Sequence, residues 1–209
     1  EWDCEARRYY FGIVGKYGIP VQKLLGKLSN WEIRKICPLH GPVLSENMEF
    51  YIDKYNTWSL YQPEEEGILI AYTSIYGNTK KAVMLLKDAL TDRGCSKVIV
   101  RDLARCDMTE VVAEAFKYSK LVLATTTYNV GIFPFMREYI NTLAEHNFSN
   151  KKIAFIENGS WAPVATKVMK NMLEKCKNLE YAENEIKIMS AMNDENKAQI
   201  IKLAEELCK

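Results

Sequence analysis

The sequence contains no long hydrophobic run, almost no net charge and only two histidines. None of its apolar stretches approaches the roughly 20 residues that a membrane-spanning helix needs. Lysine and arginine number 28 against 27 aspartates and glutamates, so bulk charge gives no attraction to nucleic acid or to a membrane surface. The first five residues, EWDCE, do not resemble a secretory signal peptide. We therefore expect a cytoplasmic protein that binds neither nucleic acid nor membrane.

The cysteines lack paired spacing such as C-x-x-C. In a chain without a secretory signal, scattered cysteines favour reduced thiols over a disulfide framework, although a redox-active cysteine stays open as an alternative. The six cysteines are Cys4, Cys37, Cys95, Cys106, Cys176 and Cys208. The hydrophobic share of 48% and the charged share of 26% indicate a globular protein with a substantial core.

A short polar segment divides the chain into two unequal parts. Pro63 should end the helix before it, three glutamates follow, and Gly67 precedes an apolar run. We assign residues 62–67 to a linker that the glutamates keep solvated, with residues 1–61 on one side of it and residues 68–209 on the other.

Beyond the linker, apolar β-rich runs alternate with helix-like segments. The apolar runs lie at 68–73, 97–101, 120–125, 152–156 and 185–189. The helix-like segments lie near 78–93, 109–118, 135–147, 163–177 and 194–208. The central runs are continuously apolar, as parallel strands are when helices cover both faces of their sheet. The pattern predicts a doubly wound α/β domain with a five-stranded parallel sheet, and 2-1-3-4-5 is the natural candidate for its strand order at this length.

The part before the linker is not expected to fold stably by itself. Helices are predicted at about 4–16, 19–29 and 45–61, with a short strand at Ile33–Cys37. Some sixty residues of this kind bury too little surface to be stable alone. We expect them to pack on the α/β domain or on a missing partner domain. The chain lacks an initial methionine and starts within a helical pattern, so we interpret it as a fragment.

The most informative segment is Ile68–Thr79, which reads ILIAYTSIYGNT. It predicts a buried strand, a tight loop and the start of a helix, where unpaired amides and the helix dipole favour an anion. Ser74, Asn78 and Thr79 can add donors around a phosphate. The G-x-x-x-x-G-K-[ST] pattern is absent, which argues against a nucleoside triphosphate. The same residue types also serve ordinary turns and helix caps.

The loop resembles the phosphate loop of flavodoxin-like proteins, T/S-x-T/Y-G-N-T, and two further loops have compositions suited to a flavin. TTTYNVGIFP follows the third predicted strand, and ENGSWAP follows the fourth. Ligands of doubly wound sheets bind at the carboxyl ends of the strands. Trp161 can stack on an aromatic ring, and Gly131 and Gly159 allow close backbone approach. The candidate cofactor-binding residues are Ser74, Ile75, Tyr76, Gly77, Asn78, Thr79, Thr126, Thr127, Tyr128, Asn129, Gly131, Phe133, Asn158, Gly159, Ser160 and Trp161.

The part before the linker extends the resemblance to the whole chain. The segments EARRYY (5–10), CPLHGP (37–42) and YNTWS (55–59) look like the tail of a metallo-β-lactamase-like domain. Followed by a flavodoxin-like domain, such a tail is similar to the flavodiiron proteins, or A-type flavoproteins. The resemblance implies electron transfer from FMN to a diiron centre that reduces dioxygen to water or nitric oxide to nitrous oxide. It also implies a rubredoxin or an NADH-linked reductase as electron donor, and a head-to-tail homodimer.

By the same resemblance, His40 occupies the position of the last histidine ligand of the diiron centre. The family's H-x-E-x-D-H motif is absent, and one histidine cannot hold two irons. We therefore expect His40 to be an orphaned ligand, with no metal bound and no reductase activity in this chain.

The α/β part shows no arrangement typical of nucleophilic catalysis, so we name no catalytic residue. Its one histidine, His146, stands where a helix end is predicted, in a capping or surface role. An FMN-dependent NAD(P)H:quinone reductase is the alternative function, although it leaves residues 1–66 unexplained. A response-regulator-like or scaffold domain would need acidic residues where this chain has Thr73 and Ser74.

Overall fold

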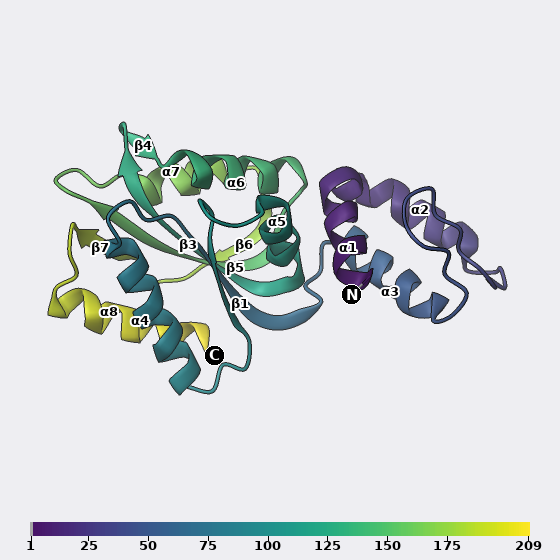
Figure 1. Ribbon diagram of the computed structural model, residues 1–209, viewed down its shortest axis with the longest axis horizontal. Helices are drawn as coiled ribbons and strands as arrows, with labels where there is room; N and C mark the ends of the chain where they lie inside the picture. The colour runs from purple at the N-terminus through teal and green to yellow at the C-terminus, as the bar shows by residue number, and fades with distance from the viewer. Residues whose placement is uncertain (1) are drawn as a thin grey trace.

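A seven-stranded sheet forms the centre of the computed structural model, which describes residues 2–209 (Figure 1). The strands are β1 (Glu65–Tyr72), β2 (Val98–Asp102), β3 (Tyr118–Tyr128), β4 (Gly131–Ile132), β5 (Ser149–Gly159), β6 (Lys177–Tyr181) and β7 (Ile186–Met189). Five of them follow the order β2-β1-β3-β5-β6 with parallel pairing throughout. The short β4 pairs antiparallel with β3, and β7 pairs parallel with the second half of β5.

Helices cover both faces of the sheet. They are α4 (Asn78–Asp92), α5 (Met108–Lys117), α6 (Pro134–Glu145), α7 (Ala165–Met172) and α8 (Asp194–Leu207). One apolar core lies between the sheet and α4 with α8, and a second lies under α5, α6 and α7. Figure 1 shows these two helical layers on opposite sides of the strands. In the part of the chain that the structure describes, no helix is long and apolar enough to cross a membrane.

The predicted sheet order is confirmed, and the differences lie at its margins. The fifth position is shared by β6 and β7, which pair with successive halves of β5. The sequence did not reveal β6, because only Leu179 of this strand is partly buried and the predicted helix at 163–177 ran over its first residue. Both β3 and β5 extend three residues beyond their predicted carboxyl ends.

The N-terminal part is a helical lobe that packs on one end of the α/β domain. It comprises the α-helices α1 (Trp2–Tyr9), α2 (Gly18–Leu28) and α3 (Met48–Ser59). Between α1 and α2 lie a short π-helix, η1 (Tyr10–Val14), and a 3₁₀ turn, η2 (Gly15–Tyr17). The ring of Phe11 stacks on that of Phe116 in α5, with centroids 3.9 Å apart. This contact makes one continuous apolar core with the α5 side of the sheet. The predicted strand at Ile33–Cys37 is wrong, since only a single bridge joins Ile36 to Leu44.

Glu64, inside the predicted linker, is buried between the two parts, and its side chain is only 2% exposed. The carboxylate accepts hydrogen bonds from Arg7 (Nη2 to Oε2, 3.0 Å), Lys54 (2.5 Å) and the indole of Trp58 (2.8 Å). The expectation that the linker glutamates are solvated is therefore wrong for Glu64. Burial alone would raise the pKa of this carboxyl, but the bonds from Arg7 and Lys54 outweigh burial and lower it.

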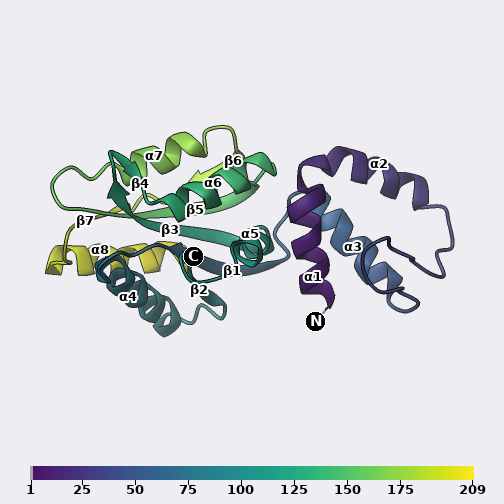
Figure 2. The same ribbon diagram turned by 45° about the horizontal axis from the view of Figure 1, so that its top comes forward.

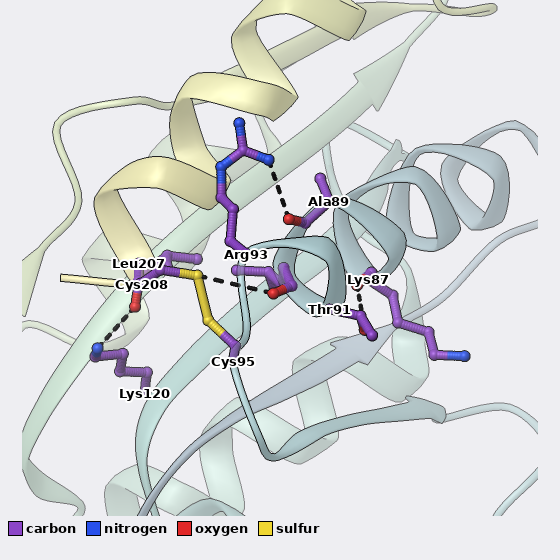
Figure 3. The surroundings of a disulfide bond; sticks show 9 residues. Lys87, Ala89, Thr91, Arg93, Cys95, Lys120, Leu207 and Cys208 are labelled. Carbon is purple, nitrogen blue, oxygen red and sulfur yellow. Dashed lines mark hydrogen bonds between the residues drawn. A yellow bond between two sulfur atoms is a disulfide. The ribbon is translucent and has the colours of Figure 1, made fainter.

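A disulfide joins Cys95, just after α4, to Cys208 at the end of α8 (Figure 3). The expectation of reduced thiols is therefore wrong for this pair, and sequence spacing gave no sign of it because 113 positions separate the two cysteines. Neighbouring contacts hold the same end of α8. Lys120 donates to the carbonyl of Leu207 at 2.7 Å, and Arg93 pairs with Glu205 at 2.9 Å.

Replacing Glu64 with glutamine should lower the free energy of unfolding at pH 7 by about 3–5 kcal/mol, because Arg7 then lacks its buried counter-charge. Urea denaturation measures this change. The exposed Glu66→Gln serves as control and should change stability by less than about 0.5 kcal/mol. Since the pKa of Glu64 is lower in the folded state, its stabilisation is present above about pH 4.5 and is lost as the pH falls further. E64Q should lack that part of the acid loss, and equal stability of E64Q and wild type would contradict the assignment.

Cys208→Ser should lower the free energy of unfolding by about 2–5 kcal/mol, since the disulfide closes a loop of more than a hundred residues in the unfolded chain. Reductant should bring the wild type to the same stability, whereas the exposed Cys37→Ser should behave like wild type. Alkylation of the unreduced, denatured protein should modify four cysteines; modification of all six would contradict the disulfide.

Candidate functional site

The three predicted loops meet at one edge of the sheet. They follow β1, β3 and β5, which are neighbours in the sheet and run in the same direction. The hydroxyls of Thr73, directly after β1, and of Thr125 in β3 lie 2.6 Å apart and are buried at this edge. Figures 1 and 2 show that the edge, marked by β4 and β7, lies at the end of the sheet opposite the N-terminal lobe.

The first loop leads into a helix whose N-cap residue is a glycine and supplies no side-chain cap. Gly77 is the N-cap of α4, with a φ of 86° that suits glycine. The Ser74 hydroxyl accepts from the amide of Lys80 at 3.2 Å. The amides of Asn78 and Thr79 belong to the first turn and have no intrahelical acceptor, so they remain available to an anion with the positive end of the helix dipole behind them.

Buried hydroxyl groups without partners gather at the same edge. Four buried side-chain polar atoms in residues 2–209 lack a hydrogen-bond partner, and three of them belong to Thr79, Thr126 and Thr166. Thr79 is 1% exposed and begins α4, Thr126 lies near the end of β3, and Thr166 is in the first turn of α7 after β5. Buried polar groups are nearly always paired in folded proteins, so such a cluster points to a polar ligand.

The second predicted loop is a β-hairpin. Thr126, Thr127 and Tyr128 belong to β3, which turns through Asn129 and Val130 into β4. Both turn residues have positive φ, 48° and 58°. That is the type I′ geometry of two-residue hairpins, and it is unfavourable for a β-branched residue such as valine. Val130 is 89% exposed, so no packing explains it.

The third predicted loop begins within β5, and several of its polar groups are already hydrogen-bonded inside the protein. Asn158 is buried in β5 and exchanges two hydrogen bonds with the backbone of Ser190, at 3.0 and 3.1 Å. Thr127 likewise accepts from the amide of Val164 at 2.9 Å. A Cβ on Gly159 would lie 3.0 Å from Pro163, so the turn itself requires a small residue. The side chains of Asn158 and Thr127 therefore position the loop that follows β5.

Exposed aromatic side chains surround the edge. Tyr76 and Trp161 are 91% and 86% exposed, and Tyr128 is 41% exposed with its ring edge-on to Phe133. Aromatic rings on three adjacent loops supply stacking surface for a planar ligand.

Several residues of the edge were missed from the sequence. They are Thr73 and Thr125, whose hydroxyls pair; Glu157, which accepts from the amide of Thr166 at 3.0 Å; Thr166 itself; and Arg137, whose guanidinium lies against Gly131. Position after a strand was the available signal for Glu157. Nothing local marks Arg137, which reaches the hairpin from α6.

His40 lies far from this edge, in the N-terminal lobe. It is exposed and stacks on Tyr9 with ring centroids 5.4 Å apart. Across residues 2–209 no three histidine, cysteine or acidic side chains are grouped to hold a metal ion. The donor set present therefore does not fit a diiron centre. His146 ends α6, and its Nδ1 lies 2.7 Å from the carbonyl oxygen of Thr142.

His40 also borders a hollow of about 1010 Å³ between α1, α2 and the 31–44 segment. Its lining is mostly apolar and includes Leu24, Leu28 and Trp31. The three loops after β1, β3 and β5 do not reach this hollow. Its mostly apolar lining suits packing against another surface rather than the binding of an anion.

Comparison with known proteins finds no matching family model but clear relatives. The rubredoxin-oxygen oxidoreductase of Megalodesulfovibrio gigas is 24% identical over 171 residues, which cover 80% of this chain and 42% of that protein. The anaerobic nitric oxide reductase flavorubredoxin of Klebsiella pneumoniae is 22% identical over 162 residues, covering 76% of this chain and 33% of that protein.

Solved structures agree. Rubredoxin oxygen:oxidoreductase from Desulfovibrio gigas superposes with a TM-score of 0.87 at 21% identity, and the flavodiiron protein of Giardia intestinalis with 0.85 at 22%. Each alignment covers 97% of this chain and 51% or 52% of the other. A flavodoxin from the domain Archaea matches 68% of the chain with a TM-score of 0.58 at 15% identity. The homologues and structural neighbours are thus flavodiiron proteins, the fold is flavodoxin-like, and the chain spans about half the length of these relatives.

Val130→Gly should stabilise the protein by about 1 kcal/mol, because glycine adopts positive φ without the steric cost that valine bears. The matched control is Val43→Gly at another exposed valine, which has no positive φ and should give no gain. Urea denaturation measures both. A loss of stability in V130G as large as that in V43G would show that the turn is not strained.

Proposed function

We propose that this chain binds FMN at the carboxyl edge of its sheet and serves as the electron-transfer part of a flavodiiron-type oxidoreductase. The observation that carries the proposal is the start of α4, where the first-turn amides of Asn78 and Thr79 adjoin the buried, unpartnered hydroxyl of Thr79. A phosphate supplies the negative charge and the acceptor oxygens that this combination lacks.

The phosphate is assigned to residues 74–79 and the flavin ring to the space bordered by residues 126–133 and 158–162. The amides of Asn78 and Thr79 and the Thr79 hydroxyl would donate to the phosphate. Ser74 would need to exchange its bond with the Lys80 amide for one to the ligand. Tyr76, Tyr128 and Trp161 are exposed and would cover the ring, which also supports the assignment of this edge to a flat aromatic cofactor.

FMN, when bound, supplies one- and two-electron chemistry, and the protein contributes binding, orientation and electrostatics. The internal bonds of Thr127 and Asn158 fix the hairpin and the third loop, so the backbone that would face the ring is held in place before binding. No side chain at the edge is assigned a catalytic role.

The wider assignment rests on the relatives. We assign residues 1–61 to part of a metallo-β-lactamase-like domain, residues 62–67 to the linker and residues 68–209 to the flavodoxin-like domain. The open apolar hollow of the N-terminal lobe supports the first assignment, since such a surface is normally covered. In the intact oxidoreductase, electrons would come from a rubredoxin or an NADH-linked reductase and would pass, in a homodimer, to a centre that reduces dioxygen or nitric oxide. The described residues do not hold that centre, so no step through it is derived.

Thr79→Val keeps the shape of the side chain but removes the hydroxyl that we assign to the phosphate. It should weaken FMN binding about tenfold or more, because a hydrogen bond to a charged group contributes roughly 1.5–3 kcal/mol. Riboflavin, which lacks the phosphate, should bind weakly and equally to both proteins. Quenching of flavin fluorescence measures the dissociation constants.

Thr91→Val is the matched control, an exposed threonine at the far end of α4 that should leave FMN affinity unchanged. A folded wild-type protein that binds no FMN would refute the proposed function. Oxidation of NAD(P)H by the purified FMN-loaded protein alone would instead favour a quinone reductase.

A further inference from the structure

Arg137 differs from every other arginine of the chain. The sequence has seven arginines, and in the described residues six of them form ion pairs: Arg7, Arg8, Arg34, Arg93, Arg101 and Arg105. The guanidinium of Arg137 has neither an ion pair nor a hydrogen bond with residues 2–209. The neighbouring Glu138 is exposed, and its carboxylate is not within ion-pair distance of the Arg137 guanidinium.

The exposed side chain of Arg137 reaches the hairpin with its guanidinium. An atom at the Cβ position of Gly131 would lie 2.7 Å from Nη2 of Arg137 and 3.5 Å from the carbonyl oxygen of Tyr128. The guanidinium therefore lies beside Gly131, which has no side chain to displace it. The cation lies directly against the β3–β4 hairpin, the element that we assign to one side of the flavin ring.

The helix that carries Arg137 adds to the positive potential there. α6 begins with Pro134 immediately after β4, and its N-cap, Phe133, offers no side-chain oxygen. The positive end of the helix dipole is therefore uncompensated beside the hairpin. Two features, the Arg137 guanidinium and the start of α6, thus place positive potential beside the hairpin, and residues 2–209 supply no counter-charge to Arg137.

We propose that Arg137 sets the redox balance of the bound flavin by stabilising its reduced form. This inference rests on the proposed function. A two-electron, one-proton reduction leaves one additional negative charge on a flavin ring, with the electrons supplied by the donor and the proton by solvent. A nearby guanidinium attracts that charge and has no comparable interaction with the neutral oxidised ring, so it acts on the reduced state alone. Arg137 acts only through its positive charge and forms no covalent bond in the reaction.

Arg137→Gln tests the inference through binding, without an assay of activity. FMN is titrated into the purified apo-protein under oxidising conditions and, separately, after reduction by dithionite in the absence of oxygen. R137Q should bind reduced FMN about tenfold more weakly than wild type and oxidised FMN within about twofold. For a two-electron couple, a tenfold change in that ratio is a fall of about 30 mV in the midpoint potential, which redox titration checks independently.

Two further variants serve as controls. Arg137→Lys keeps the charge and should retain most of the preference for reduced FMN. Arg34→Gln removes an exposed arginine in the N-terminal lobe and should match wild type in both titrations. Circular dichroism shows whether each variant is folded.

The outcomes separate the inference from the proposed function. If wild type and R137Q both bind FMN with the same ratio of oxidised to reduced affinities, Arg137 has no redox role although the flavin site stands. If R137Q weakens both forms equally, the arginine contributes to binding only and the inference is wrong. If the wild type binds neither form, the proposed function itself fails.

Discussion

The buried carboxylate of Glu64 is the interaction on which the arrangement of this chain depends. Glu64 directly precedes β1, and its carboxylate joins this strand to Arg7 of α1 and to Lys54 and Trp58 of α3. A carboxylate at 2% exposure is tolerable only when each oxygen is paired, so breaking any of these contacts leaves a buried charge uncompensated. The helical lobe and the first strand are consequently fixed to each other, and the stacked rings of Phe11 and Phe116 extend the contact into α5.

The same strand carries this constraint to the opposite end of the sheet. β1 begins one residue after Glu64 and ends at Tyr72, where Thr73 and Ser74 open the loop before α4. It lies between β2 and β3 in the sheet, and its buried residues form core on both faces. The loops after β1, β3 and β5 are held by adjacent parallel strands, which explains how three segments distant in sequence form one edge with unpartnered hydroxyl groups.

Much of the α/β domain could be predicted from the sequence, because its central strands are continuous apolar runs separated by helices with clear periodicity. That alternation predicted the doubly wound sheet, and the strand order was expected as the flavodoxin order that suits a domain of this length. The features that could not be predicted depend on distant partners. Polar β6 gains its pairing only from β5, Glu64 is buried only because Arg7 and Lys54 meet it, and Cys95 joins a cysteine that is 113 positions away.

In the candidate site, too, local sequence features could be predicted and features that depend on distant partners could not. The phosphate-loop composition of residues 74–79 identified the edge, and glycines and aromatics marked the other two segments. Sequence could not show that Asn158 and Thr127 use their polar groups inside the protein, or that the hydroxyl of Thr166 is left without a partner. It also could not place Arg137 against Gly131, since that contact depends on the angle at which α6 leaves the hairpin.

The most direct measurement is the amide NMR spectrum of isotopically labelled protein with FMN, with riboflavin and with inorganic phosphate. The account predicts that FMN shifts the amides of Asn78 and Thr79 together with those of the 128–131 hairpin and the 159–161 segment. Riboflavin at high concentration should affect the hairpin and the third segment but leave Asn78 and Thr79 unchanged, and phosphate should do the reverse. Shifts confined to the hollow of the N-terminal lobe, or no shifts with FMN in a folded sample, would contradict it.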